Sequence, residues 1–201
     1  MEFLHKILHS KEYKKIGKIE KKEDEVVEFI KTLAVALIFM LCIRFYIIQP
    51  FSVKGSSMEP SFYEGEYLIV DEISYRFSEP QRGDIVVFKL KNKDYNEYLI
   101  KRIIGLPGET VVIKDGKVII KNEENKDGYI LKENYLPEER LTNGELEESV
   151  PLNSYFVLGD NRGVSYDSRL FGFIEKDKLT GKVLFRGLPI ERAGLIEMGR
   201  Y

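Results

Sequence analysis

The most apolar stretch of the chain extends from Phe29 to Ile48, with charged residues near its two ends at Lys31 and Arg44. A helix of about 20 residues spans the ~30 Å apolar core of a bilayer, and basic side chains near its ends can reach the interface. Residues 45–48 are bulky, whereas a cleavable signal peptide ends in small residues. The pattern predicts an uncleaved transmembrane helix over residues 29–48; a buried core helix is the alternative.

Residues 1–28 are rich in lysine and precede this stretch directly. Short lysine-rich segments next to a membrane helix stay in the cytoplasm, whereas long domains are translocated whatever their charge. We therefore predict a cytoplasmic tail over residues 1–28 and an exported domain over residues 49–201. In a bacterium this is a single-pass protein of the cytoplasmic membrane, with its N-terminus inside and its main domain outside.

Beyond residue 49 the apolar residues occur in short stretches that are separated by glycine-containing turns. Many short strands with little helical periodicity indicate a mainly β, antiparallel domain. Apolar runs on both sides of Asp115-Gly116 predict a β-hairpin. The polar stretch after it has no strong period, so residues of about 109–150 are expected to form an excursion from the main sheet. The expected strands are 66–70, 82–88, 98–104, 111–120 with the hairpin turn, 155–158 and 182–185.

Composition excludes several classes of function for the exported domain. The chain of 201 residues has 31 basic and 33 acidic residues, and its net charge of -2 gives no reason to expect a nucleic-acid partner. The single cysteine, Cys42, lies in the apolar stretch, so the domain can form neither an intrachain disulfide nor a thiolate metal site. Both histidines, His5 and His9, lie in the tail. Any catalysis in the domain must proceed without imidazole, and we expect no metal and no cofactor.

Ser57 is the first candidate for chemistry. It lies among small residues in the segment from Gln49 to Ser61, and Pro60 restricts the backbone just after it. Such a setting leaves room around a hydroxyl and holds it in a rigid turn, which suits a nucleophile. The alternative is a polar linker that leaves the membrane helix. A serine nucleophile also needs a base, and without histidine the candidates are carboxylates and lysines.

Lys101 is the candidate base because it lies in the apolar run Leu99–Ile104. At an unperturbed pKa of ~10.4, only about one lysine in 2,500 is neutral at pH 7. Reaching a pKa near neutrality requires a decrease of ~3.4, and burial can supply ~3–5. A Ser-Lys pair is a known variant of the serine triad. The alternative is a lysine that points at water.

A third segment, Gly159–Arg169, alternates acidic and basic residues, which indicates a hydrogen-bonded loop or a solvated polar turn. The other motifs are Ser57-Met-x-Pro, then Arg82-Gly-Asp-Ile-Val-Val-Phe, then Lys101-Arg-x-x-Gly-x-Pro-Gly. Along the chain, one membrane helix is followed by these three motifs and then by Gly159–Arg169. In this order the four segments resemble type I signal peptidase, in particular the Gram-positive form with a single membrane anchor. The match extends from about Phe29 to Arg169, and more loosely to Lys182.

The resemblance implies a membrane-bound serine endopeptidase that removes N-terminal signal peptides from exported preproteins at the outer face of the cytoplasmic membrane. It implies a curved antiparallel β-sheet catalytic domain whose apolar surface rests on the membrane, with a smaller lobe inserted at about residues 109–150. The expected partners are preprotein signal peptides and the lipid bilayer, with the export translocon as a further candidate.

By the same resemblance, Ser57 takes the position of the nucleophile and Lys101 that of the general base. Ser165 would hydrogen-bond the lysine amine and orient it. The backbone N–H of Ser57 would be one donor to the oxyanion. Some members have a serine at the position of Gly55, and its hydroxyl is the second donor. Here the second donor is left open between a backbone group and Ser56.

Further residues are assigned only through the resemblance. Two ion pairs would brace the site without reacting, Asp160 with Arg102 and Asp167 with Arg169. Apolar side chains would line the shallow pockets for small substrate side chains. These pocket residues are Phe51, Val53, Met58, Leu99 and Ile100.

Besides Gly55, three positions depart from the family pattern. Gly163 and Val164 stand where Asp-Asn is common, and Ser61 stands where Thr is usual. Gly163 and Val164 are not expected to touch the scissile bond, so they put the hydrogen bonds of the loop in question rather than the reaction, and Ser61 is a mild change. Two other functions stay open. One is a self-cleaving Ser-Lys protease like the SOS-type repressors, although the chain has no DNA-binding segment; the other is a non-catalytic, membrane-tethered β domain.

Overall fold

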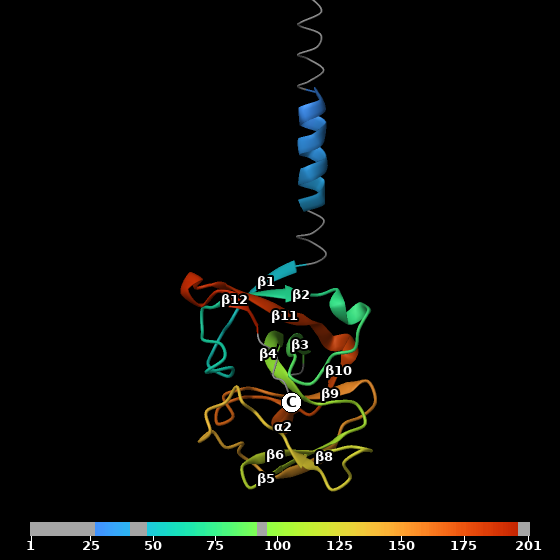
Figure 1. The fold of residues 1–201 in the computed structure, drawn as a ribbon, viewed down its shortest axis with the longest axis vertical. Helices are drawn as coiled ribbons and strands as arrows, with labels where there is room; N and C mark the ends of the chain where they lie inside the picture. Colours follow the sequence, from blue (N-terminus) through green and yellow to red (C-terminus); the bar gives the residue numbers. More distant parts are fainter. Residues whose placement is uncertain (1–26, 41–47, 92–95, 197–201) are drawn as a thin grey trace, which may run out of the picture. The chain divides into compact units, whose positions relative to one another are not determined.

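The computed structural model describes residues 27–40, 48–91 and 96–196 (Figure 1). The chain divides into two compact units, residues 1–45 and 46–201. Residues 27–40 form a helix, and its large apolar side chains are exposed. Within the described ranges, no helix is long and apolar enough to cross a membrane. Residues 41–47 of the predicted transmembrane helix lie outside the described part, as does most of the predicted tail.

The predicted C-terminal residue of the membrane helix is wrong. Ile48, expected as its last residue, is the first residue of strand β1 (Ile48–Ser52). The aromatic and β-branched residues before Gln49 suit a strand as well as a helix. Pro50 cannot continue a helix, but it is accepted in β1 because this strand lies at the edge of its sheet.

The main sheet has eight strands, in the order β1-β2-β11-β3-β4-β9-β10, with β12 paired to β11. Every pairing in it is antiparallel, so the prediction of a mainly antiparallel β domain is confirmed. Besides β1, its strands are β2 (Tyr67–Asp71), β3 (Ile85–Lys91), β4 (Asn96–Gly105), β9 (Ser154–Leu158), β10 (Ile174–Glu175), β11 (Leu179–Leu188) and β12 (Gly194–Leu195).

A second sheet has four strands, in the order β7-β6-β5-β8, and lies in the chain between β4 and β9. The hairpin between β5 and β6 turns at Asp115 and Gly116, whose positive φ of 51° and 76° suit a tight two-residue turn. Strand β8 escapes prediction because its sequence, Leu-Glu-Glu-Ser, is largely exposed and lacks apolar alternation. The strands are β5 (Thr110–Lys114), β6 (Lys117–Lys121), β7 (Tyr129–Ile130) and β8 (Leu146–Ser149).

Three clusters of buried apolar side chains stabilise the domain. One joins the two sheets, because Ile104 and Phe156 of the main sheet pack in the same cluster as Ile120 of the second. Another includes Met58, which is fully buried. Burial of a methionine side chain contributes ~1.5–3 kcal/mol, so Met58 anchors the turn that carries Ser57. Short helical turns complete the fold: η1 (Ser74–Arg76), α2 (Ser168–Phe171), η2 (Lys176–Lys178) and η3 (Ile190–Arg192).

Candidate active site

Ser57 lies in the turns that follow β1, and the loop after β9 holds its backbone. Gly55, just before it, has a φ of 73°, which a residue with a side chain rarely adopts. The carbonyl of Ser57 accepts a hydrogen bond from the N–H of Asn161 at 3.0 Å, and the Asn161 side chain donates to Ser56 O at 3.1 Å. A Cβ at Gly159 would come within 2.5 Å of Ser57 O, so this close approach requires glycine.

Lys101 lies on β4, and its side chain reaches the hydroxyl of Ser57. Lys101 Nζ is 2.8 Å from Ser57 Oγ and donates to Ile100 O at 2.8 Å. Only 2% of Lys101 is exposed. This burial lowers the pKa of its ammonium to about 8, although Asp167 and Asp160 act in the opposite direction. At such a pKa roughly a tenth of the amines are neutral at pH 7.

Two ion pairs lie close to this amine. Arg102 binds Asp160 through two N–H groups, at 2.9 and 2.7 Å. Arg169 binds Asp167 in the same way, with both distances 2.8 Å. Both carboxylates are fully buried and need such partners. Among the described residues Lys101 forms no salt bridge, because the two neighbouring carboxylates are bound by arginine.

The expected hydrogen bond between Ser165 and Lys101 is wrong. Ser165 Oγ is buried and has no hydrogen-bond partner among the described residues. It packs against Gly159, where an added Cβ would lie 2.2 Å from this oxygen. The amine of Lys101 is directed at Ser57 and at the carbonyl of Ile100 instead. A supporting role for Ser165 stays a prediction.

A cleft of about 430 Å³ opens beside Ser57 and Lys101, which both line it. Met58, assigned to the pockets, belongs to the buried cluster with Phe62 and Leu68 and does not line this cleft. A pocket wall and a core are both apolar, so the sequence cannot separate them at this position. The other residues assigned to the pockets line the cleft: Phe51, Val53, Leu99 and Ile100.

Sequence reasoning misses other residues around the site. Tyr98 lines the cleft and packs edge-on against Phe51, with 5.4 Å between the ring centroids. An aromatic residue on the strand of a candidate base is the signal that would identify it. Asn161 is also missed, although it lies inside the charged motif that begins at Gly159.

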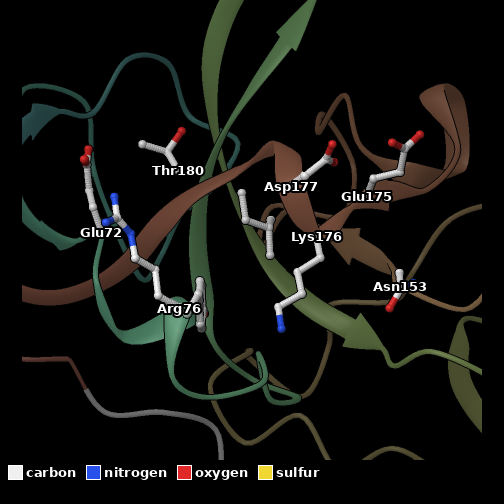
Figure 2. Close-up of a pocket in the computed structure, with 9 residues that line it drawn as sticks. Glu72, Arg76, Asn153, Glu175, Lys176, Asp177 and Thr180 are labelled. Atoms are coloured by element: carbon white, nitrogen blue, oxygen red, sulfur yellow. The ribbon is translucent and has the colours of Figure 1, made fainter.

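A larger hollow of about 760 Å³ is lined by residues of η1, β10 and η2 (Figure 2). Acidic side chains such as Glu72 and Glu175 line it together with basic ones such as Lys176. Lys176 forms an ion pair with Glu79 at 2.5 Å and is therefore not placed to take a proton from a hydroxyl. Across the described residues, no group of three or more His, Cys, Asp or Glu side chains could hold a metal ion. The hollow therefore lacks the chemistry of the cleft.

Comparison with known proteins identifies the family. A solved structure of a signal peptidase I from Enterococcus faecalis is 33% identical, covering 52% of this chain and 97% of its own at a TM-score of 0.43. A family model described as signal peptidase, peptidase S26, matches residues 26–188. Signal peptidase I of Leptolyngbya laminosa is 38% identical over 87% of this chain and 85% of its own length. Signal peptidase IB of Staphylococcus aureus is 34% identical over 82% of this chain and 91% of its own. By the family match and these two relatives, the chain is an enzyme that belongs to the type I signal peptidases of the peptidase S26 family.

Proposed function

We propose that this enzyme removes N-terminal signal peptides from exported preproteins, with Ser57 as nucleophile and Lys101 as general base. The distance of 2.8 Å between Lys101 Nζ and Ser57 Oγ carries the proposal. Membership of the family supports the class of substrate. The pKa of Lys101, lowered by burial to about 8, supports its action as a base near neutral pH.

In the first half of the reaction, Ser57 Oγ attacks the scissile carbonyl carbon while its proton passes to the neutral Nζ of Lys101. The carbonyl oxygen becomes an oxyanion and accepts a hydrogen bond from the N–H of Ser57, with a backbone group or Ser56 as second donor. Lys101, now an ammonium, gives its proton to the leaving amine as the C–N bond breaks. The mature protein leaves, and the signal peptide is held as an ester of Ser57.

In the second half, Lys101 takes a proton from water, and the water oxygen attacks the ester carbon. The ester C–O bond breaks, Ser57 Oγ recovers its proton from Lys101, and the signal peptide leaves as a carboxylic acid. The pair of Asp160 with Arg102 and that of Asp167 with Arg169 hold the surrounding loops without reacting.

The apolar cleft selects small substrate side chains. In an extended substrate, alternate residues point the same way, so the side chains at -1 and -3 from the cut face the cleft together. One extra methylene in a well-fitted pocket discriminates by only ~1–3 kcal/mol, but a bulky aromatic side chain at -1 is excluded by clash. We therefore expect small residues at both positions. Apolar residues that line the cleft include Phe51, Val53, Leu99 and Ile100.

The apolar stretch that begins at Phe29 anchors the enzyme in the cytoplasmic membrane, with residues 1–28 inside and the catalytic domain outside. Ser57 follows Ile48 by nine residues, so it lies within ~30 Å of the start of β1. Exposed apolar side chains on the main sheet and around η3 support contact with lipid. They are Tyr67, Leu184, Leu188, Ile190 and Leu195. The translocon as a partner and the inserted lobe at about 109–150 stay predictions.

The first experiment incubates the full-length protein in lipid vesicles with a purified preprotein and identifies the products by mass. The wild type should cut in trans at the end of the signal peptide. Ser57→Ala loses only one small hydroxyl, so it should melt at the same temperature and cut nothing. Cleavage of the enzyme itself and of nothing else would indicate the self-cleaving alternative, and no cleavage by the wild type would indicate the non-catalytic one.

A second experiment tests the orientation in the membrane. Protease added outside intact spheroplasts should digest the residues beyond 50 and spare the lysine-rich tail. Protection of the C-terminal domain would contradict the proposed orientation and, with it, processing at the outer face.

A further inference from the structure

The 133–143 segment lies between β7 and β8 of the second sheet, yet its side chains and one of its carbonyls contact the segments that carry the candidate active site. It reaches three arginines of the main domain and one carbonyl in the turn after Ser57. The groups contacted are Arg102, Arg162, Arg169 and Glu59 O. A segment that served only to link two strands would not need these contacts.

Arg162 receives most support from this segment and is only 1% exposed. Its Nη1 donates to Glu133 Oε2 at 2.8 Å and to Thr142 Oγ1 at 2.5 Å, and its Nη2 donates to Tyr135 OH at 3.0 Å. A second contact joins Nη2 to Glu133 Oε1. On its other side, Nε donates to Gly159 O at 3.0 Å. The guanidinium therefore ties the 133–143 segment to the loop that begins at Gly159.

The same loop holds the backbone of the nucleophile. Asn161, the neighbour of Arg162, donates its N–H to Ser57 O and its side-chain amide to Ser56 O. A displacement of Arg162 would therefore move Asn161, and with it the two hydrogen bonds that hold the backbone at Ser56 and Ser57. Both the N–H and the Oγ of Ser57 take part in the proposed reaction, so their positions matter to its rate.

Two further contacts reach the remaining parts of the site. The ring of Tyr135 lies over the guanidinium of Arg102, with Cζ 3.8 Å from the ring centroid. Such a contact is stronger when it is desolvated, and Arg102 is buried beside Lys101 on β4. Arg140 Nη1 donates to Glu59 O at 2.6 Å, in the turn that carries the nucleophile. One segment thus holds neighbours of both members of the dyad.

We propose that the 133–143 segment positions the catalytic dyad, with Glu133 and Tyr135 acting through the arginines as positioning residues. The inference rests on the proposed Ser-Lys reaction and gives the second sheet a role in it, because that sheet supports the segment at both ends. A misplacement of reacting groups by about 1 Å can lower a rate by ~10²-fold. Loss of one contact between the segment and Arg162 should therefore lower kcat measurably.

The experiment compares Glu133→Gln with Glu109→Gln in the full-length protein. The two carboxylates are matched, because 13% and 10% of their side chains are exposed and each pairs with an arginine. Glu109 pairs with Arg82, whose guanidinium donates to Ile104 O and not to the 159–162 loop. The measurements are kcat and KM for preprotein cleavage, the melting temperature, and amide hydrogen exchange of residues 157–163.

Glu133→Gln should lower kcat by about ten- to a hundredfold, with KM changed by less than about threefold, because the reacting groups are displaced. Amide exchange of residues 157–163 should rise. Glu109→Gln should lower the melting temperature by a similar amount but keep kcat within about twofold and leave this exchange unchanged. Equal kcat and equal exchange in the two variants would overturn the inference.

Hydrogen exchange separates this inference from the proposed function, because exchange does not depend on cleavage. If the wild type cuts no preprotein, the proposed reaction fails, and the exchange of residues 157–163 still decides whether the segment holds the loop. If Glu133→Gln does not fold, Arg140→Met removes the hydrogen bond to Glu59 O from a partly exposed position. This variant should lower kcat by about three- to tenfold at an unchanged melting temperature. Unchanged kcat and unchanged exchange around residue 59 would overturn the inference.

Discussion

Lys101 and Lys176 each line a hollow in the same domain, the cleft beside Ser57 and the hollow of Figure 2. The side chain of Lys176 is 31% exposed and pairs with Glu79 at 2.5 Å. Lys101 is 2% exposed, and its amine contacts a hydroxyl and a carbonyl. Burial lowers the pKa of Lys101 to about 8, whereas a carboxylate partner favours the charged form of an amine. Burial without a paired counter-charge therefore favours the neutral form of a lysine, which is the form that a general base requires.

The arginines next to Lys101 maintain this condition. Asp160 and Asp167 are close enough to raise the pKa of the amine. Arg102 and Arg169 each bind one of these carboxylates through two hydrogen bonds. Neither carboxylate pairs directly with Lys101, so the loss of hydration still lowers the pKa of the amine.

The largest effect is expected for Lys101→Arg, compared with Lys176→Arg. Arginine cannot lose its proton in a protein, so at position 101 it cannot accept the proton of Ser57. We expect kcat to fall by about 10³-fold or more, near the upper range for loss of a general base. Lys176→Arg keeps a cation beside Glu79 and should keep the wild-type kcat. Initial rates of preprotein cleavage measure both, and a Lys101→Arg enzyme with most of its activity would contradict the Ser-Lys mechanism.

The sequence predicts the strands whose apolar pattern is strong and misses those whose pattern is weak. The strand expected over residues 98–104 is observed as β4, Asn96–Gly105, because its second half is a continuous buried run. Strand β8 is polar and β1 overlaps the apolar stretch before it, so neither gives a strand signal of its own. Their pairing with β5 and β2 depends on long-range contacts that local pattern does not encode.

The residues of the candidate site also fall into those that the sequence predicts and those that it does not. Motifs are sufficient to select Ser57 and Lys101, and the structure places their functional atoms 2.8 Å apart, although their roles stay predictions. The expected contact of Ser165 is wrong because it depends on one rotamer and on the close approach of Gly159. Glu133 is invisible in the sequence, since it lies in a polar stretch without a period and meets its arginine only in the folded chain.

The next largest effect is expected on the free energy of unfolding, when the ion pairs near the two lysines are broken one at a time. Asp160→Asn leaves the buried guanidinium of Arg102 without its counter-charge, which should lower the free energy of unfolding by about 3–5 kcal/mol. Glu79→Gln removes the exposed partner of Lys176 and should leave the free energy of unfolding unchanged, because surface ion pairs contribute little. Denaturant titrations at pH 7 measure both. Equal losses would show that burial does not distinguish the two pairs.

A stability gain is expected for Lys101→Met. The pKa of Lys101 falls from 10.5 in the unfolded chain to about 8 in the folded one, which corresponds to about 3 kcal/mol against the charged, folded amine. Methionine has a similar volume and no charge. The free energy of unfolding of the variant at pH 7 should therefore be higher by up to about 3 kcal/mol, while activity is lost. The gain should shrink as the pH rises from 8 to 10.5, where the unfolded lysine also becomes neutral. Lys176→Met should show no gain, and a destabilised Lys101→Met at pH 7 would contradict the assigned cost of burial.

The dependence of kcat/KM on pH identifies the base most directly. If Lys101 is the base, Ser57 can transfer its proton only to the neutral amine, so kcat/KM should rise about tenfold per pH unit below the pKa of Lys101 in the free enzyme and become constant above it. The midpoint should lie at about 8, because burial lowers the pKa more than Asp167 and Asp160 raise it. Lys176→Arg should leave this midpoint unchanged, since Lys176 lines the other hollow and pairs with Glu79. A midpoint near the ordinary carboxylate pKa of ~4 would instead identify an acidic side chain as the base, and a midpoint near the ordinary lysine value of ~10.4 would mean that Lys101 is hydrated in the working enzyme.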